Sequence, residues 1–483
     1  MTARRVRRHG AGAQRGAAFY LFVVLTLTMT AMLFSGAAAM RGTDARAAEA
    51  ERVLADARRA VLAYLTQPDV PWVAADAGRR LGDWRLTPDL PIAAGAGDDA
   101  AEPVLDGLSD AGCATRTWTP GGALSPPSAS GAAARCFGRL PWRTLGVAPV
   151  GEDSPESDPR GTVPWLVISP NLVAGRPCVP DLNPLMLSAD WGGFACPTTL
   201  PWPWLRVVDE RGNLLSDRVA FALVLPGPPV DGQVRGPAAG PAAFLDALTV
   251  TADCVAPCEP GTYSNAAFSH ADGVPTTLVR GPAPGSAAAR VPGLAQPLRF
   301  NDRLVYVTAD ELLEALEARA RAELVARLTE ARVATGAFPW GASLDTPDGA
   351  CVTGLRVGHP PTQCASGPAP ALPAWFTDGG WHRYFVYAVS PRCTPVSGGC
   401  TAPGLRVGAR TDVEALVLAP GRAIRAAPFA PSKLLAQAPL SGLLPSPLLR
   451  DYLDTVENAD GDDTFESIAV PSTSVNDRLT VVR

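Results

Sequence analysis

Residues 16–40 read GAAFYLFVVLTLTMTAMLFSGAAAM, and residues 41–65 read RGTDARAAEAERVLADARRAVLAYL. The first segment has no charged side chain, and about 20 apolar residues can cross a bilayer core as a helix. The second segment has no proline, and its apolar residues recur at Val53, Ala57, Val61 and Leu65, the spacing of one helix face. Together the two segments predict one long helix, with a transmembrane part at 17–40 and an amphipathic part at 41–66.

A basic leader precedes this helix. Residues 1–16 contain Arg4, Arg5, Arg7, Arg8 and Arg15. Such a flank stays in the cytoplasm by the positive-inside rule. We therefore expect a single-pass membrane protein whose remaining residues are exported.

The leader and the helix carry a family resemblance. Gln14-Arg15-Gly16 followed by an unbroken apolar helix resembles the N-terminus of type IV prepilins, the family of pilins and of type II secretion pseudopilins. The later residues resemble large, two-part pilin-like proteins of Gram-negative bacteria. The motifs that carry this second resemblance are GRLPW at 138–142, FNDRL at 300–304, GWHR at 380–383 and YAVSP at 387–391.

The resemblance implies a processing site and partners. In this family, the prepilin peptidase cuts after the glycine, here Gly16, and methylates the next residue, here Ala17. The implied partners are the inner membrane, this peptidase, and other pilin-like subunits or secretion-system components. The chain departs from the family at Ala17, where Phe or Met is usual, and at Leu21, where a Glu neutralises a neighbour's amino group. Because an unpaired charge in hydrocarbon is costly, Leu21 favours a tip or minor subunit, or a protein that does not polymerise.

A second interpretation of the N-terminus remains open. Ala37-Ala38-Ala39 supplies an A-x-A site of the kind that signal peptidase cleaves, after a basic region and an apolar region. The apolar run is longer than the usual 7–15 residues, and the helical period continues past the site. An uncleaved signal anchor is the third possibility.

Composition limits the partners. The chain has 483 residues, 47% of them apolar, with a net charge of -5 and a pI near 5.5. Phosphate binding needs clustered Lys and Arg, so we expect no nucleic-acid partner.

The ten cysteines fall in neighbouring pairs, which in an exported chain predicts local disulfides. Cys254 and Cys258 could alternatively form half of a metal site, although no second pair with zinc spacing occurs. The five expected bridges are Cys113–Cys136, Cys178–Cys196, Cys254–Cys258, Cys351–Cys364 and Cys393–Cys400.

A second long helix is predicted at 308–336. Thr308 and Glu311 form a capping-box pattern, and Gly336 supplies the stop. The predicted apolar face is Leu312, Leu316, Ala320, Leu324 and Leu328. The predicted solvent-facing side chains are Glu314, Glu317, Arg319, Arg321 and Arg327.

Six sequence elements occur twice in the same order, which predicts an internal duplication. The matched pairs are 70–72 with 338–340, 140–142 with 372–375, 165–170 with 386–391, 219–227 with 413–421, 244–246 with 452–454, and 300–304 with 475–479. In the repeated Asn-Asp-Arg, we expect Asn-Asp to form an Asx turn and Arg to pair with a carboxylate.

The predicted fold class is α+β: a long transmembrane and amphipathic helix, then two duplicated helix-plus-antiparallel-sheet units of the kind found in pilins. The predicted segments are the leader at 1–16, transmembrane helix at 17–40, amphipathic helix at 41–66, first sheet-rich unit at 67–307, second helix at 308–336 and second sheet-rich unit at 337–483.

The sequence offers little chemistry. It contains none of the P-loop, HExxH, GxSxG or Rossmann glycine motifs. Asp460, Asp462 and Asp463 surround a glycine and could bind calcium, although their spacing is not that of an EF-hand; a solvated loop is the alternative, and no other cofactor is expected. An exported hydrolase would require a pocket that gathers His382 or His270 with acids.

These observations favour a non-enzymatic, membrane-anchored pilin-like protein that acts by assembly. An exported binding or adhesion module, held by the same helix or released by a signal peptidase, is the alternative.

Overall fold

The computed structural model describes the following residues: 48–67, 137–146, 163–169, 172, 204–227, 229, 233–235, 240–250, 258–266, 276–281, 300–345, 349–365, 369–400, 404–422, 448–468, 472 and 475–482. The leader and the predicted transmembrane helix at 17–40 lie outside these ranges. Among the described helices, none has the length and apolarity that a bilayer crossing requires.

The first unit is a helix over 48–66 followed by strands that form a six-stranded sheet and a separate hairpin. The sheet order is β1-β2-β4-β3-β7, and β8 also pairs with β4. The long strand β4 serves both halves of the sheet, because its start pairs with β3 and its end lies between β2 and β8. The elements are β1 (Phe137–Arg139), β2 (Trp165–Ile168), β3 (Leu205–Asp209), β4 (Leu214–Leu225), η5 (Pro241–Ala243), β5 (Ala247–Val250), β6 (Gly261–Ser264), β7 (Thr277–Arg280) and β8 (Arg303–Thr308).

The second unit begins with α3 and contains a four-stranded sheet, β15-β13-β10-β9, and a three-stranded sheet, β12-β11-β14. Its elements are α3 (Ala309–Thr335), β9 (Val357–Gly358), α4 (Ala374–Asp378), η7 (Trp381–Arg383), β10 (Val386–Val389), β11 (Leu405–Val407), β12 (Arg410–Val413), β13 (Ala415–Ala419), η9 (Leu449–Asp451), α6 (Val456–Ala459), β14 (Thr464–Phe465) and β15 (Arg478–Val482).

The two units share one strand arrangement. The antiparallel order β1-β2-β4-β8 of the first unit matches β9-β10-β13-β15 of the second. A further match joins a hairpin to a parallel strand: β3 pairs with β4 and with β7, as β11 pairs with β12 and with β14. Each unit is therefore mixed, because it contains one parallel pair that the expectation of purely antiparallel sheets did not include.

The sequence match between 140–142 and 372–375 has a local counterpart. Pro141 and Pro373 each open a helical turn, in which the carbonyl oxygens accept from Leu145 N and Thr377 N at 3.1 and 3.4 Å. The strand that precedes the turn differs between the units. In the first unit β1 runs directly into the turn, whereas in the second unit β9 ends at Gly358, well before Pro373.

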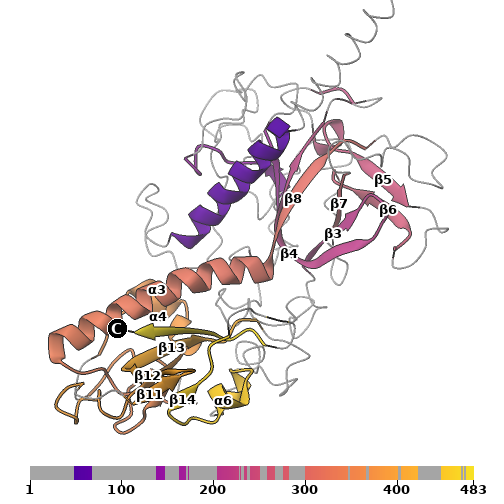
Figure 1. The fold of residues 1–483 in the computed structure, drawn as a ribbon. Coiled ribbons are helices and arrows are strands. Elements are labelled where there is room, and N and C mark those ends of the chain that lie inside the picture. Colours follow the sequence, from indigo (N-terminus) through magenta and orange to yellow (C-terminus); the bar gives the residue numbers. More distant parts are fainter. Residues whose placement is uncertain are drawn as a thin grey trace, which may run out of the picture.

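In each unit, one helix packs on the four matched antiparallel strands (Figure 1). The sequence-predicted caps of α3 are confirmed: Thr308 and Glu311 form a complete capping box, and Gly336 ends the helix with φ of 78°. Arg303 on β8 pairs with Glu51 of the first helix at 3.7 Å, and Arg478 on β15 pairs with Glu314 of α3 at 2.7 Å. If these two ion pairs are taken as equivalent, Glu51 corresponds to Glu314, and the other residues of the two helices correspond in step.

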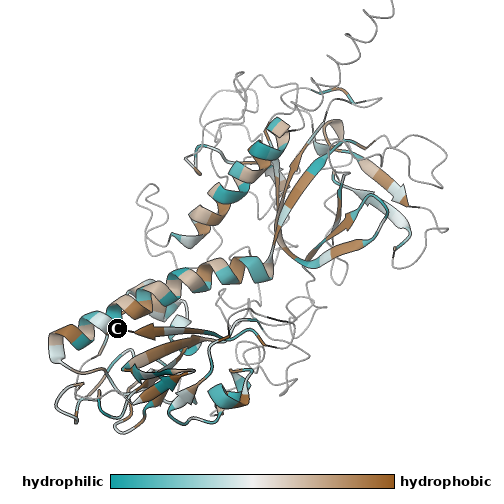
Figure 2. Ribbon diagram, in the orientation of Figure 1, coloured by the Kyte–Doolittle hydropathy of each residue, from teal (hydrophilic) through white to brown (hydrophobic). Residues whose placement is uncertain are grey.

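The aligned positions form the buried stripe of each helix. In Figure 2 both helices alternate between hydrophilic and hydrophobic residues, and the central strands are hydrophobic. The buried residues Val53, Leu54, Ala57, Val61 and Leu65 of the first helix correspond to Leu316, Glu317, Ala320, Leu324 and Leu328 of α3.

Glu317 corrects the predicted solvent side of α3. Its side chain is 1% exposed and occupies the position that Leu54 fills in the first helix. Tyr384 donates its hydroxyl proton to Glu317 Oε2 at 2.8 Å, and Arg478 Nη1 lies 3.4 Å from Oε1. Burial raises the pKa of Glu317. The positive charge of Arg478 and the hydrogen bond from Tyr384 oppose part of this increase. Helical spacing cannot reveal these partners, because they lie on β15 and beside η7.

We expect Glu317→Leu to lower the free energy of unfolding by about 1–3 kcal/mol, because the Tyr384 hydroxyl loses its buried acceptor. Combining it with Tyr384→Phe should recover part of that loss, with a coupling energy of about 0.5–3 kcal/mol in a double-mutant cycle. Chemical denaturation of the full-length protein in detergent measures both values. Glu330→Leu, at an exposed position of the same helix, is the control and should change stability by less than about 0.5 kcal/mol. Strict additivity of the two core substitutions would contradict this account.

The two units are joined without a linker. Thr308 is both the last residue of β8 and the N-cap of α3. Asp310 in the first turn pairs with Arg218 of the first unit at 3.0 Å and with Arg422 of the second at 3.6 Å. One continuous apolar core includes both helices and residues of both sheets.

Candidate functional site

Two buried aspartates lock the first unit at the start of β8. Asp246 follows η5, and Asp302 precedes β8. The backbone N–H of Asp246 donates to Asp302 Oδ2 at 2.7 Å, and the N–H of Asn301 donates to Asp246 Oδ2 at 2.7 Å. Each carboxyl group thus holds the backbone of the other segment.

The second unit repeats this lock. The N–H of Asp454, which follows η9, donates to Asp477 Oδ2 at 2.7 Å, and the N–H of Asn476 donates to Asp454 Oδ2 at 2.8 Å. The predicted pairing of the Asn-Asp-Arg arginines with carboxylates is confirmed at Arg303 and Arg478. The aspartates bind a segment distant in sequence, which the expectation of a local turn did not include.

An asparagine in each unit binds the backbone at or just after the parallel strand. Asn265 Oδ1 accepts from Val279 N in β7 at 2.8 Å, and Asn458 Oδ1 accepts from Glu466 N just after β14 at 2.8 Å. Asn265 Nδ2 donates to Asp302 Oδ2 at 3.1 Å, whereas Asn458 Nδ2 has no hydrogen-bond partner in the part of the chain that the structure describes. We call each trio an aspartate latch: Asp246, Asn265 and Asp302 in the first unit, and Asp454, Asn458 and Asp477 in the second.

Burial controls the charge of the first latch. Burial, together with the negative charge of Asp246, raises the pKa of Asp302 to about 8. Burial also raises the pKa of Asp246. Asp302 Oδ1 has no hydrogen-bond partner among the described residues. The pair therefore holds a proton at neutral pH, as expected of two neighbouring carboxyl groups out of water.

An Arg or His side chain contacts an aromatic ring near each latch. The Cζ of Arg139 is 4.3 Å from the ring centroid of Trp165 and 4.2 Å from that of Phe244, which follows η5. His359 holds the matching position after β9, with its ring centroid 5.3 Å from that of Tyr452, which follows η9. Sequence reasoning missed this correspondence, because one position is Arg and the other His.

His359 is neutral in the folded protein. Its Nδ1–H donates to the carbonyl oxygen of Phe385 at 2.9 Å. Burial, together with the nearby His382 and Arg383, lowers the pKa of His359 to about 4. Charging this imidazole would place a cation in the core without a counterion, so its neutral form stabilises the fold.

We expect acid to destabilise the second unit through His359. The pKa is depressed on folding, so the stability is present above about 6.5 and is lost as pH falls toward 4, by up to ~3 kcal/mol. In His359→Asn, an amide replaces Nδ1–H as the donor to Phe385 and does not titrate. Denaturation at pH 4 to 7 should therefore show a steeper loss in the wild type than in the variant. Parallel pH profiles would contradict this.

Two predicted disulfides are confirmed, Cys351–Cys364 and Cys393–Cys400. Cys258 is also disulfide-bonded. The remaining predicted members, Cys113, Cys136, Cys178, Cys196 and Cys254, lie outside the described residues, so the other three pairings stay predictions.

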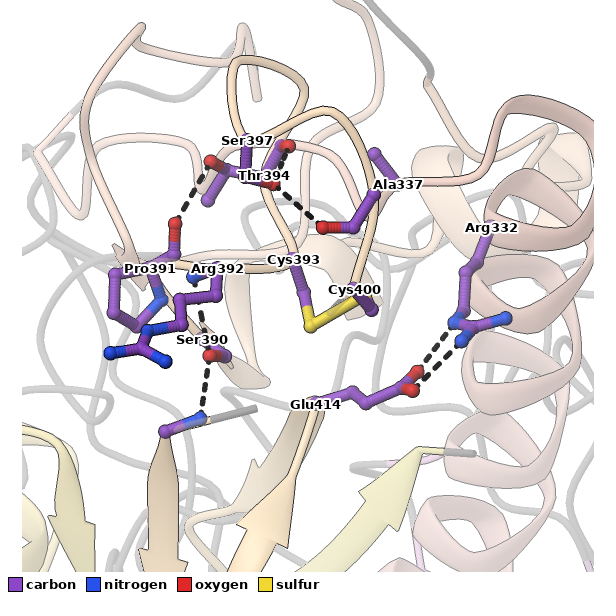
Figure 3. The surroundings of a disulfide bond; sticks show 12 residues. Arg332, Ala337, Ser390, Pro391, Arg392, Cys393, Thr394, Ser397, Cys400 and Glu414 are labelled. Atoms are coloured by element: carbon purple, nitrogen blue, oxygen red, sulfur yellow. Dashed lines mark hydrogen bonds and ion pairs between the residues drawn. A yellow bond between two sulfur atoms is a disulfide. The ribbon is translucent and has the colours of Figure 1, made fainter. Parts of the chain in front are cut away.

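The Cys393–Cys400 bridge closes a loop between β10 and β11 that lies beside the C-terminal end of α3 (Figure 3). Phe338 N donates to the carbonyl oxygen of Cys393 at 2.8 Å, and Ser390 Oγ accepts from Gly404 N at 2.8 Å. Beside the bridge, Arg332 Nη2 donates to Glu414 Oε1 at 2.8 Å. The bridge thus fixes the C-terminal end of α3 to the second sheet.

Among the described residues, one group of side chains brings three potential metal ligands together. Cys393, Cys400 and Glu414 are the one group of three ligand atoms within 4.8 Å there, and its sulfurs form a disulfide while its carboxylate binds Arg332. That group therefore has no free ligand to offer a metal.

The proposed calcium residues lie in the turn between α6 and β14. Asp460 Oδ1 accepts from Asp462 N at 3.1 Å, Asp462 Oδ1 accepts from Thr464 N at 2.5 Å, and Asp463 forms an ion pair with Arg356. Each carboxylate thus has a protein partner of its own. Calcium binding here stays a prediction.

The other predicted site residues are only partly described. Gly16 and Ala17 of the processing site lie outside the described residues, as does His270. His382 lies on η7 with its side chain 7% exposed. The pocket that an exported hydrolase would need stays untested.

Comparisons with known proteins found no matching family model, no matching curated protein and no matching solved structure.

Proposed function

We propose that this chain is a membrane-anchored, pilin-like structural protein of a type IV pilus or a type II secretion-like system. The observation that carries the proposal is the helix over 48–66, which lies by its apolar stripe on a sheet whose strands β1, β2, β4 and β8 pair in antiparallel fashion. In the sequence this helix follows a 25-residue segment without charges, at 16–40. A membrane helix that continues into the helix of a helix-on-sheet domain is the arrangement that the prepilin resemblance implies.

The second unit fits the same proposal as an internal duplication. It repeats the strand order and the latch of the first unit, and α3 takes the place of the anchored helix. A duplicated chain of this kind has one anchor and two globular units. Because β8 leads into α3 without a linker, the two units would move as one body when the anchor is extracted from the membrane.

The role of a minor or tip subunit follows from Leu21. A subunit within a homopolymer needs a carboxylate at this position to neutralise its neighbour's N-terminal amine, and an unpaired charge in hydrocarbon is costly. A subunit at the end of a filament has fewer neighbours to neutralise. The alternative is an exported binding or adhesion module that uses the helix only as an anchor.

Mass spectrometry of the mature N-terminus tests the proposal. We expect the protein purified from cells that contain a prepilin peptidase to begin at N-methylated Ala17, and protein from cells without the peptidase to retain Met1. A mature protein that begins at Met40 would favour the secreted module. Retention of Met1 in both strains would indicate a signal anchor and contradict the pilin pathway.

Two matched substitutions separate these pathways. Gly16→Val should abolish processing if the prepilin peptidase acts, because the family requires glycine at this position. Ala39→Val should leave that processing unchanged but block a signal peptidase, which needs small residues at its site. The opposite pattern would establish the signal-peptide alternative.

A further inference from the structure

The first unit carries an outer layer formed by the β5–β6 hairpin, which lies beside the β3–β7 edge of the six-stranded sheet. A small apolar cluster joins Leu248 and Val250 of the hairpin to Val208, Val279 and Phe300. Five buried residues are few compared with the continuous core beneath the helices. Segments with little buried apolar area open locally at a lower free energy than the whole domain, so the layer depends on its polar attachments.

The first aspartate latch supplies an attachment at every strand of this layer. Asp302 Oδ2 accepts from Asp246 N, immediately before β5, and from Asn265 Nδ2, immediately after β6. Asn265 in turn accepts from Val279 N and donates to Val279 O at 3.0 Å, which fixes β7. The Asp302 carboxyl group therefore connects β5, β6 and β7 to the start of β8.

We propose that a single proton on the Asp246–Asp302 pair holds this layer closed, so that the layer opens locally as pH rises while the rest of the chain stays folded. The latch is a pH-sensitive device of the first unit. Two buried carboxyl groups that bind each other's backbone segments repel when both are ionised, and opening the layer returns them to water.

The surroundings of the pair offer little compensation for a second negative charge. Arg235 is the cation that acts on both carboxyl groups. Gln233 donates to Asp246 Oδ1 at 3.0 Å, and Asn265 donates to Asp302; both are neutral. Arg235 stays charged across the neutral range, so the titration that changes the latch is that of the two aspartates.

The direction of the effect follows from linkage. The closed layer keeps the proton up to pH about 8, whereas an exposed aspartate loses it near pH 4. Opening therefore releases one proton between these values, and the opening equilibrium constant should rise about tenfold per pH unit. Above pH 8 both states are ionised and the dependence should level off.

Hydrogen exchange of the full-length protein in detergent at pH 5, 6, 7 and 8 tests the device. Protection factors, which correct for the intrinsic exchange rate, should fall about tenfold per pH unit in peptides that cover β5 and β6. Peptides that cover β2 should keep theirs. Protection of the outer layer that does not change with pH, or that changes equally throughout the chain, would overturn the proposal.

A substitution at the latch separates charge from structure. In Asp302→Asn the amide oxygen can accept from Asp246 N and Asn265 Nδ2, and the NH₂ group replaces the protonated oxygen. This variant should keep the layer protected at pH 8, at least tenfold more than the wild type. Asp477→Asn in the second latch is the matched control and should leave the outer layer as in the wild type. If Asp302→Asn fails to fold, the wild-type profile still decides the proposal.

Discussion

The burial of one apolar helix face on each antiparallel sheet is the interaction on which the rest of this structure depends. The stripe of the first helix and the corresponding stripe of α3 join residues of both sheets into one core. Such burial contributes about 25 cal/mol per Å² of apolar surface, so it outweighs the individual ion pairs that align the helices. The Arg303–Glu51 and Arg478–Glu314 pairs are partly exposed and set register more than stability.

Polar groups enter this core at equivalent places, and most of their hydrogen-bonding atoms have partners. The latches use aspartates to satisfy backbone N–H groups where the chain leaves a 3-10 turn and where it enters β8 or β15. Glu317 takes the place of Leu54 but gains Tyr384 and Arg478 as partners. A buried ionisable group without partners would cost several kcal/mol. The repeated positions show how the same packing frame accepts either an apolar residue or a compensated polar one.

The two units differ in how pH acts on them. In the first, a proton on the Asp246–Asp302 pair favours the closed form, so acid strengthens the latch. In the second, the neutral form of His359 favours the fold, so acid weakens it. Both effects have one cause, the cost of a charge in a site without water, and they have opposite signs because a carboxyl group is neutral when protonated and an imidazole when deprotonated. The chain as a whole should therefore be most stable at intermediate pH, between the acid that charges His359 and the base that ionises both Asp246 and Asp302.

Local patterns in the sequence determined much of the secondary structure. The cap at Thr308, the glycine at 336 and the apolar period between them specify α3, and short spacings identified the disulfides at 351–364 and 393–400. The apolar runs around 165–168, 386–389 and 415–419 are strands, as their composition indicates. These features were predictable because the interacting residues are close in sequence.

Only the tertiary structure decided the latches, the buried position of Glu317 and the equivalence of Arg139 with His359. It also decided the parallel pairs β3–β7 and β11–β14, although Leu-Arg-Val occurs at both 205–207 and 405–407. Asp246 and Asp302 are 56 residues apart, and Tyr384 and Glu317 are 67 apart. A hydrophobic period of two or of 3.6 residues indicates which face of a strand or helix is buried. It does not indicate which distant side chain packs against that face. That choice is made when the elements pack, because burial then requires every polar group to find a partner.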